Sequence, residues 1–220
     1  MTPVLDWQEI DTVLLDMDGT LLDLHFDNYF WRQHLPACYA RQNGVPLTEA
    51  TTYLTQLFAL HQGSLQWYCL DFWRQALDMD IVALKREVQH LIAVRHEVDV
   101  FLAALRQAGK HIVLVTNAHP DSLTLKMQRT ALTSNFDLMV TSHQLGLAKE
   151  QPGFWEALQM LVPFHAQRTV LFDDSLAVLR NAQEYGIRYL RSIHQPDSQA
   201  PAQDVAGFAA VGRFGEVMPV

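Results

Sequence analysis

The stretch TVLLDMDGTLLD, residues 12–23, begins as a buried strand and ends in closely spaced acids. Three apolar residues, Val13 to Leu15, run directly into Asp16, and a second acid follows at Asp18. Apolar runs without alternation are typical of parallel strands that are buried on both faces. The stretch therefore predicts a central strand that delivers two carboxylates to one end of a sheet.

The same pattern recurs later in the chain. Four more apolar runs end in polar residues: HIVLVTN (111–117), DLMVTSH (137–143), TVLFDDS (169–175) and IRYLRSI (187–193). Helical patterns fill the intervals, at 98–109, 120–132, 152–161 and 175–186. Strands that alternate with helices predict right-handed βαβ crossovers. We therefore expect an α/β fold with a doubly wound, Rossmann-like parallel sheet.

The first strand departs from this rhythm, because nearly all of the sequence between it and residue 98 has helical patterns. Four helical segments fit this interval, at residues 28–43, 48–61, 64–77 and 80–94. They carry much of the aromatic content of the chain, including the stretches 29–31 and 67–73. The simplest interpretation is a core of residues 1–22 and 98–220 that carries a four-helix insertion at residues 23–97. The sequence from His194 onward is rich in Pro, Gly and Ala and predicts an irregular tail.

The net charge of -8 argues against nucleic-acid polymers and anionic membrane surfaces as partners, because both require basic patches. The N-terminal stretch has no Lys or Arg before Arg32 and no long apolar run, so we expect neither a signal peptide nor a membrane span. Cys38 and Cys69 lack metal-ligand spacing in the sequence, which indicates two reduced thiols and a cytoplasmic location. Motifs of P-loop nucleotide triphosphatases, serine hydrolases and zincins are absent from the sequence.

Polar residues follow four of the predicted strands at the edge where open α/β sheets bind ligands. They are Asp16, Asp18, Thr116, Asn117, Lys149, Asp173, Asp174 and Ser175. Each alone is weak evidence, since acids after strands commonly cap helices or form turns. Their conjunction in this order points to one site. Four carboxylates at one edge would repel one another unless a cation joined them, and an all-oxygen cluster favours Mg²⁺.

DMDGTLLD, VTN, a later lysine and FDDS together resemble the four motifs of the haloacid dehalogenase (HAD) superfamily of phosphohydrolases. The helical insertion is placed where that superfamily has its C1-type cap. FDNYFW, WYCLDFW and TNAHP are similar to GMP/IMP-type purine nucleotidases of the superfamily. The resemblance implies a Mg²⁺-dependent phosphomonoester hydrolase, with a purine nucleoside monophosphate as its small-molecule substrate.

The resemblance also implies the roles of the acids. Asp16 is expected to attack phosphorus and become an aspartyl phosphate. Asp18 is expected to protonate the leaving oxygen and then deprotonate water, with its carboxylate held by the Thr20 hydroxyl. The implied metal ligands are the Asp16 carboxylate, the Asp18 carbonyl and Asp174, with Asp173 binding directly or through water.

The remaining implied roles concern the phosphoryl group. Thr116 and the region of Asn117 are expected to donate hydrogen bonds to phosphoryl oxygens, and Lys149 is expected to offset charge on the nucleophile and the phosphate. Many relatives have Pro directly after this lysine, whereas this chain has KEQP, residues 149–152. His119 either contacts the leaving group or stands in its loop without a ligand role.

Alternative functions stay open at this point. A phosphatase acting on sugar phosphates or phosphoglycolate, or a phosphomutase, would use the same core residues. A dehalogenase has no need of Asp18, which weighs against it. A catalytically inactive phosphate-binding regulatory module is expected to have lost at least one motif, and none is lost here.

Overall fold

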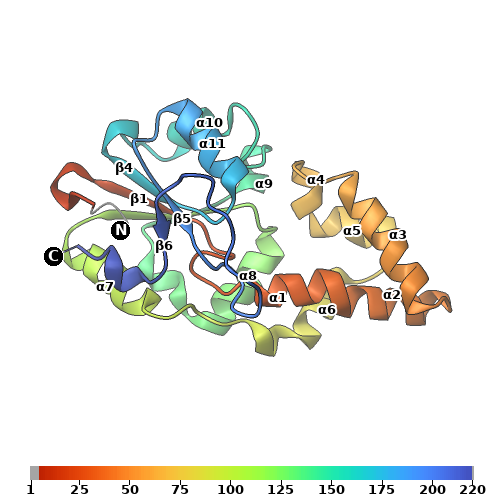
Figure 1. Cartoon of the computed structure of the whole chain (residues 1–220). Helices are drawn as coiled ribbons and strands as arrows, with labels where there is room; N and C mark the ends of the chain where they lie inside the picture. The colour runs from red at the N-terminus through yellow and green to blue at the C-terminus, as the bar shows by residue number, and fades with distance from the viewer. Residues whose placement is uncertain (1–4, 220) are drawn as a thin grey trace.

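A parallel sheet forms the centre of the molecule in the computed structural model, which describes residues 5–219. Its strands are β1 (Thr12–Leu15), β2 (His111–Thr116), β3 (Leu138–Thr141), β4 (Thr169–Phe172), β5 (Tyr189–Ile193) and β6 (Ala210–Val211). They lie in the order β3-β2-β1-β4-β5-β6, and every paired neighbour is parallel (Figure 1). Strands β1 and β4 thus lie at the centre of the sheet, with β2 and β3 toward one edge and β5 and β6 toward the other. The predicted doubly wound α/β fold is confirmed.

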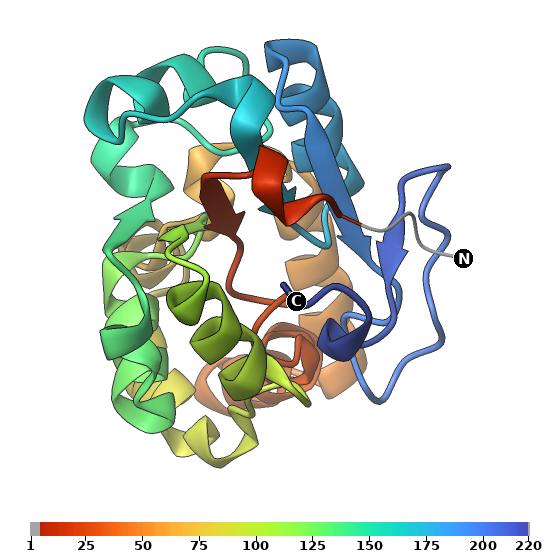
Figure 2. The same ribbon diagram turned by 90° about the vertical axis from the view of Figure 1, so that its left-hand side faces the viewer.

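Helices cover both faces of this sheet (Figure 2). The helices of the core are α7 (Val98–Gln107), α8 (Pro120–Thr130), α9 (Ser142–Leu145), α10 (Phe154–Leu161) and α11 (Leu176–Tyr185). Val13 and Leu15 of β1 belong to the same buried cluster as Phe101 of α7, whereas Leu14 belongs to the cluster of Trp155 of α10. Successive strand residues point to opposite faces, so burial on both faces requires the unbroken apolar run seen in the sequence.

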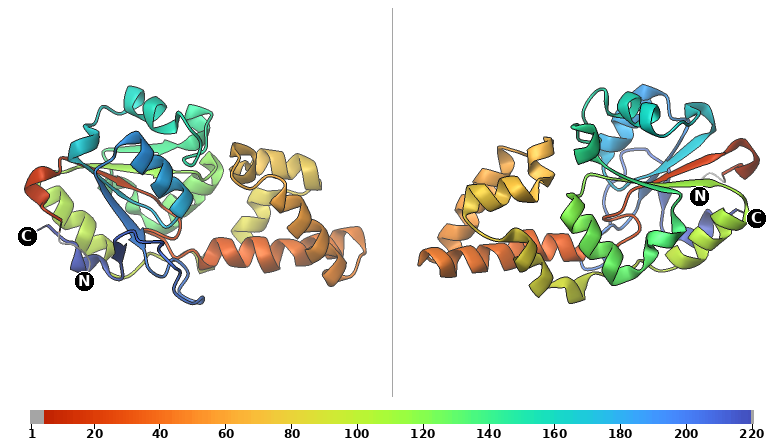
Figure 3. Two further views of the ribbon diagram at one scale, coloured as in Figure 1. Left: turned by 45° about the horizontal axis from the view of Figure 1, so that its top comes forward. Right: turned by 180° about the vertical axis from the view of Figure 1, so that it is seen from behind.

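The helices of residues 23–97 form a group beside the sheet (Figure 3). They are α1 (His25–Tyr29), the π-helical η2 (Phe30–His34), α2 (Leu35–Asn43), α3 (Leu47–Ala59), α4 (Leu65–Tyr68), α5 (Leu70–Leu77), α6 (Ile81–Glu87) and the short η3 (Gln89–Leu91). The first three are continuous and end at Gly44, which has a left-handed conformation. Among the described residues, no helix is both long and apolar enough to cross a lipid bilayer.

Two of the four predicted helical segments are shorter or interrupted. The segment at 64–77 is broken at Cys69, whose backbone is extended and whose Sγ accepts a hydrogen bond from the Phe72 N–H at the start of α5. The segment at 80–94 leaves the α-helical conformation after Glu87.

The prediction of an irregular tail after His194 was wrong in part. The tail returns to the sheet as β6, which pairs with β5, and it then forms a 3-10 turn, η6 (Phe214–Glu216). Phe214 is buried, with its ring centroid 4.7 Å from that of Phe101. Three further 3-10 turns, η1 (Trp7–Glu9), η4 (Leu132–Asn135) and η5 (Ala166–Arg168), connect the main elements.

Candidate active site

The carboxyl ends of β1, β2 and β4 bring the predicted polar residues to one place. Leu15 of β1 is in register with Leu114 of β2 and Phe172 of β4, so the next residues, Asp16 and Asp173, emerge side by side. The strand order reverses between β1 and β4, and this switch point is where open α/β sheets bind ligands. The position of the acids therefore follows from the topology.

Lys149 neutralises the two buried acids. Its Nζ lies 2.5 Å from Asp16 Oδ1 and 2.6 Å from Asp173 Oδ2, and it also donates to the Val115 carbonyl at 3.1 Å. Burial would lower the pKa of Lys149, but the two carboxylates raise it above its usual range. Burial and the neighbouring Asp173 raise the pKa of Asp16 to about 6, against the opposing effect of Lys149. One lysine thus holds the Asp16 carboxylate in a fixed orientation.

A cluster of carboxylates offers a site for a divalent cation. Oxygen atoms of Asp16, Asp173 and Asp174 all lie within 4.8 Å of one another. Burial, followed by the charges of Asp16 and Asp173, raises the pKa of Asp174 well above its usual range. A bound cation would remove this repulsion, and an oxygen-only ligand set suits Mg²⁺.

Gly19 leaves room for this cluster. A Cβ at Gly19 would stand 2.6 Å from Asp174 Oδ2, and the residue has a left-handed φ of 80°. Only glycine adopts this conformation without strain and avoids the carboxylate. The turn that follows Asp18 is therefore fitted around Asp174.

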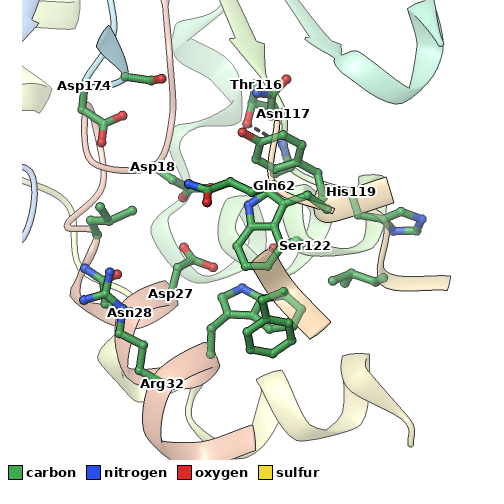
Figure 4. Close-up of a pocket in the computed structure, with 18 of the residues that line it drawn as sticks. Asp18, Asp27, Asn28, Arg32, Gln62, Thr116, Asn117, His119, Ser122 and Asp174 are labelled. Carbon is green, nitrogen blue, oxygen red and sulfur yellow. Dashed lines mark hydrogen bonds between the residues drawn. The ribbon is translucent and has the colours of Figure 1, made fainter. Parts of the chain in front are cut away.

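Asp18 points into a cavity and contacts a lysine that the sequence analysis missed (Figure 4). Lys126 Nζ of α8 lies 2.6 Å from Asp18 Oδ1 and 2.6 Å from Asp27 Oδ2 of α1. Burial, opposed by Lys126, raises the pKa of Asp18 to about 6. The lysine connects a core acid with an acid of the helical group.

A second buried lysine completes a row of alternating charges. Lys85 Nζ of α6 lies 2.8 Å from Asp27 Oδ1, and it stands over the rings of Phe26 and Phe30 at 4.8 and 4.6 Å from their centroids. Burial would raise the pKa of Asp27, but the two lysines hold it well below its usual range. Asp27 is therefore a fixed negative charge that positions Lys126 beside Asp18.

Asn117 and Glu150 connect the loop of Lys149 to the helical group. Asn117 Nδ2 donates to Glu150 Oε2 at 2.8 Å, and Asn117 Oδ1 accepts from the Lys149 N–H at 2.9 Å. Tyr68 of α4 donates its hydroxyl proton to Glu150 Oε1 at 2.8 Å. Glu150, directly after Lys149, thus supplies a contact between the two parts of the chain.

A cavity of about 680 Å³ lies between the sheet and the helical group. Its floor contains the acids and Lys149, and Figure 4 shows Asp18, Asp27 and Gln62 directed into it. The aromatic residues in its lining are Trp31, Phe58, Trp67 and Tyr68, and the polar residues contributed by the helices include Asn28, Arg32 and Gln62. The cavity thus has a charged floor, formed by the acids and Lys149, and an aromatic wall.

Comparison with known proteins decides the family. The model of the haloacid dehalogenase-like hydrolases matches residues 10–186 of the chain. The chain belongs to this family. It is 44% identical over 213 residues to the GMP/IMP nucleotidase YrfG of Escherichia coli K12, with 97% of this chain and 96% of that protein covered. The same identity and coverage hold for the GMP/IMP nucleotidase YrfG of Shigella flexneri.

Solved structures of HAD proteins share the fold. An HAD phosphatase from Thermococcus onnurineus superposes with a TM-score of 0.77 at 21% identity, covering 94% of this chain and 95% of that one. The HAD hydrolase YfnB from Bacillus subtilis, solved with bound magnesium, gives a TM-score of 0.62 at 17% identity, covering 94% of this chain and 96% of that one. Both likenesses extend over the sheet and the helical group together.

The structure brings most of the site residues predicted from the HAD motifs into one cluster. Asp16, Asp18, Lys149, Asp173 and Asp174 line the cavity, and so does Thr116, whose Oγ1 accepts from the Ala118 N–H. One expected contact is not observed among the described residues: Thr20 Oγ1 is buried without a hydrogen-bond partner, so it does not hold Asp18. The Asn117 side chain holds the Lys149 loop.

Lys126, Asp27, Lys85, Glu150 and Tyr68 were missed by sequence reasoning. One signal for Lys126 was available: it follows Ser122 by four residues, and these two buried polar residues share one face of α8. A lysine on the buried face of a helix that starts at the carboxyl end of a strand is a candidate site residue. Asp27, Glu150 and Tyr68 depend on contacts between the helical group and the core, and Lys85 depends on its contact with Asp27 inside the helical group.

Proposed function

We propose that this HAD hydrolase is a Mg²⁺-dependent 5'-nucleotidase that removes the phosphate from purine nucleoside monophosphates, with GMP and IMP preferred. The observation that carries the proposal is the cavity, in which the charged floor with Asp16 and Asp18 faces an aromatic wall. The floor suits a phosphoryl group and the aromatic wall suits a flat base. The 44% identity to a GMP/IMP nucleotidase, over nearly the whole length of both proteins, supports the same substrate class.

In the first step Asp16 attacks the phosphorus, and the bond from phosphorus to the ester oxygen breaks as an aspartyl phosphate forms. Lys149 holds the attacking carboxylate and balances its charge before and after the attack. The Thr116 hydroxyl and backbone N–H groups at the end of β2 are available to bind phosphoryl oxygens. Mg²⁺ held by Asp16, Asp173, Asp174 and the Asp18 carbonyl would neutralise charge on the transferring group.

Asp18 supplies the proton that the leaving ribose oxygen needs. Its raised pKa of about 6 favours the protonated form more than an exposed aspartate would. After the nucleoside leaves, the Asp18 carboxylate accepts a proton from water, which attacks the aspartyl phosphate and releases inorganic phosphate. The two adjacent acids thus have separate roles, as nucleophile and as proton carrier.

The aromatic wall of the cavity would select the base of the nucleotide. Trp31, Phe58 and Trp67 line the cavity, whereas Trp73 and Phe30 are fully buried in the interior of the helical group. A stacked base gains about 1–3 kcal/mol on an aromatic side chain. The 6-oxo group shared by guanine and hypoxanthine is an acceptor that the Gln62 amide or the Arg32 guanidinium could bind.

Residues 23–97 would act as a cap that closes over the substrate. Closure excludes water while the leaving group departs, and opening releases the products. The contacts of Tyr68 with Glu150 and of Asp27 with Lys126 are the interactions that a closed cap requires. The cap therefore carries both the base-binding wall and the contacts that hold it over the acids.

A panel of phosphate esters tests the substrate. The purified chain with Mg²⁺ is given GMP, IMP, AMP, CMP, a hexose phosphate and phosphoglycolate, and free phosphate is measured. We expect the highest kcat/KM for GMP and IMP. If a sugar phosphate or phosphoglycolate were hydrolysed about ten-fold more efficiently than GMP, the cavity would be wrongly assigned to a purine, although the phosphatase activity would stand.

Substitution of Lys126 tests the row of buried charges. Lys126→Met removes the cation that bridges Asp18 and Asp27, so the pKa of Asp18 should rise further and its orientation should be lost. We expect kcat for GMP to fall by a factor on the order of 10², the range of general acid–base catalysis. Lys85→Met is the matched control, since Lys85 contacts Asp27 and not Asp18. Equal losses in the two variants would show that Lys126 acts only through stability.

Substitution of Tyr68 tests the contact between cap and core. Tyr68→Phe removes one hydrogen bond to a carboxylate, and such bonds contribute about 1.5–3 kcal/mol. We expect kcat/KM for GMP to fall by about ten-fold, with unchanged thermal unfolding of the core. Tyr53→Phe, on an exposed part of α3, is the control. Wild-type kinetics in Tyr68→Phe would contradict a role for this contact in closure.

A further inference from the structure

Three side chains with soft or borderline metal-binding atoms meet where the cap contacts the core. They are Cys69, between α4 and α5, His119, the N-cap residue of α8, and His143, in α9. One ligand atom of each lies within 4.8 Å of the others. His119 is turned away from Asp18 (Figure 4), and the mechanism above uses none of the three. The cluster is separate from the carboxylate site and differs from it in chemistry.

Among the described residues, each histidine of this cluster has one ring nitrogen without a hydrogen bond. His143 Nε2 is buried and has no hydrogen-bond partner among the described residues. Burial, followed by the neighbouring His119, lowers the pKa of His143 to about 4, so its ring is neutral near pH 7. His119 Nδ1 accepts a hydrogen bond from the Asp121 N–H at 3.3 Å, which leaves Nε2 for another partner. The two rings are perpendicular, with centroids 4.9 Å apart.

The cysteine is placed to act as a thiolate. Cys69 is a free cysteine, and its Sγ accepts the Phe72 N–H at 3.4 Å as the N-cap of α5. The N-terminus of a helix stabilises negative charge, including that of a metal-bound thiolate. Asp71 Oδ2, 3.6 Å from His119 Nε2, adds a negative charge beside the cluster.

We propose that Cys69, His119 and His143 form a second metal site, one that takes Zn²⁺ and bridges the cap and the core. On binding, the Cys69 thiol releases its proton to solvent, and one thiolate and two neutral imidazoles coordinate the ion, with water in the fourth position. Zn–S and Zn–N bonds of about 2.3 and 2.0 Å place tetrahedral ligand atoms roughly 3.3–3.6 Å apart. Small side-chain rotations would bring the three atoms to these separations.

A metal at this site would hold the cap closed. Cys69 directly follows Tyr68, whose hydroxyl already contacts Glu150 of the core. A thiolate from the cap and two imidazoles from the core would add bonds that must break before the cap opens. Because product release requires opening, Zn²⁺ is expected to inhibit turnover without displacing Mg²⁺. This inhibition rests on the proposed function, whereas the binding of the metal does not.

Another cysteine cluster provides an internal comparison. His34, Cys38 and Glu87 also lie within 4.8 Å of one another, but all three belong to the cap. His34 Nε2 is already paired with Glu87 at 3.0 Å, and Cys38 Sγ accepts from Arg41 at 3.4 Å. The polar atoms of this cluster are engaged with one another, and a metal there would not connect cap to core.

Titration with Co²⁺ in saturating Mg²⁺ tests the site directly, because Co²⁺ bound by a thiolate gives a near-ultraviolet charge-transfer band that carboxylate ligation does not produce. We expect this band, with the visible spectrum of tetrahedral cobalt, and its loss on addition of one equivalent of Zn²⁺. Cys69→Ser should abolish the band, His143→Gln should weaken cobalt binding at least about ten-fold, and Cys38→Ser should change neither. No thiolate band in the wild type, or a band lost in Cys38→Ser and kept in Cys69→Ser, would overturn the proposal.

Kinetics test the consequence for turnover. Zn²⁺ added in the presence of saturating Mg²⁺ should inhibit phosphate release from the wild type and from Cys38→Ser, with reversal by a chelator followed by Mg²⁺. Cys69→Ser should need at least about ten-fold more Zn²⁺ for half-inhibition. Equal inhibition of Cys69→Ser and wild type would refute the cap-holding role. A wild type without phosphatase activity but with the cobalt band would instead refute the proposed function alone.

Discussion

Asp16→Asn is expected to abolish hydrolysis of GMP and IMP, with kcat reduced by a factor on the order of 10⁴ or more, as for other nucleophile deletions. The amide has nearly the shape of the carboxylate but is a far weaker nucleophile. It also removes one partner of Lys149, whose Nζ lies 2.5 Å from Asp16 Oδ1. Steady-state phosphate release, with enzyme concentrations high enough to detect slow turnover, measures the loss.

Comparison of Asp18→Asn with Asp16→Asn separates the roles of the two acids. Asp18→Asn keeps the nucleophile and removes the proton carrier, so kcat should be strongly reduced, whereas fluoride-based phosphate mimics should still bind. Thermal unfolding of both variants shows whether the core is intact, since neither substitution removes the Asp173–Lys149 pair, which is 2.6 Å apart in the wild type. Normal turnover in Asp16→Asn would show that the nucleophile is another residue.

The wild-type reaction separates this activity from its alternatives. A phosphomutase would transfer the phosphoryl group to a second site on a sugar phosphate instead of releasing it, so the ratio of free phosphate to consumed ester distinguishes the two. An inactive phosphate-binding module would release none from any ester. The match to HAD hydrolases and the complete set of core acids favour hydrolysis.

The sheet could be predicted because its physical cause is local in sequence. Residues 13–15 are buried on alternate faces by α7 and α10, and this burial requires a run of apolar residues that is visible without a structure. Strand β6 is different: it has two residues, Ala210 and Val211, and its place depends on the return of the tail to β5. Two residues carry no periodicity, so the tail was predicted to be irregular.

The residues of the active site also fall into those that short sequence patterns predict and those that depend on tertiary contacts. Asp16, Asp18, Asp173 and Asp174 follow directly from the ends of β1 and β4, so strand prediction was enough to bring them together. The contact of Asp27 with Lys126 joins helices 99 residues apart, and that of Tyr68 with Glu150 spans 82 residues. Such contacts depend on how the cap packs against the core, and a single sequence does not encode that packing in any short pattern.

Removal of divalent cations is the second change expected to eliminate activity. Asp16, Asp173 and Asp174 hold their oxygens within 4.8 Å of one another, and Lys149, which is paired with Asp16 and Asp173, opposes their repulsion. Without Mg²⁺, burial and the charges of Asp16 and Asp173 raise the pKa of Asp174 well above its usual range, and no cation links this carboxylate to the phosphoryl group. Phosphate release should fall to background in excess chelator and return fully when Mg²⁺ is added in excess. Full activity in excess chelator would contradict the metal assignment.

Two substitutions locate the metal without relying on the chelator. Asp174→Asn removes a charged ligand, and Gly19→Ala places a Cβ 2.6 Å from Asp174 Oδ2 in a left-handed turn, so both should raise the Mg²⁺ concentration for half-maximal activity by about ten-fold or more. Gly44→Ala is the matched control for backbone strain, since Gly44 also has a positive φ but no atom within 4 Å of its Cβ position. If neither Asp174→Asn nor Gly19→Ala raised the Mg²⁺ requirement above that of Gly44→Ala, Asp174 would not bind the cation. If Asp174→Asn alone raised the requirement, Asp174 would bind the cation and the turn at Gly19 would be able to shift away from it.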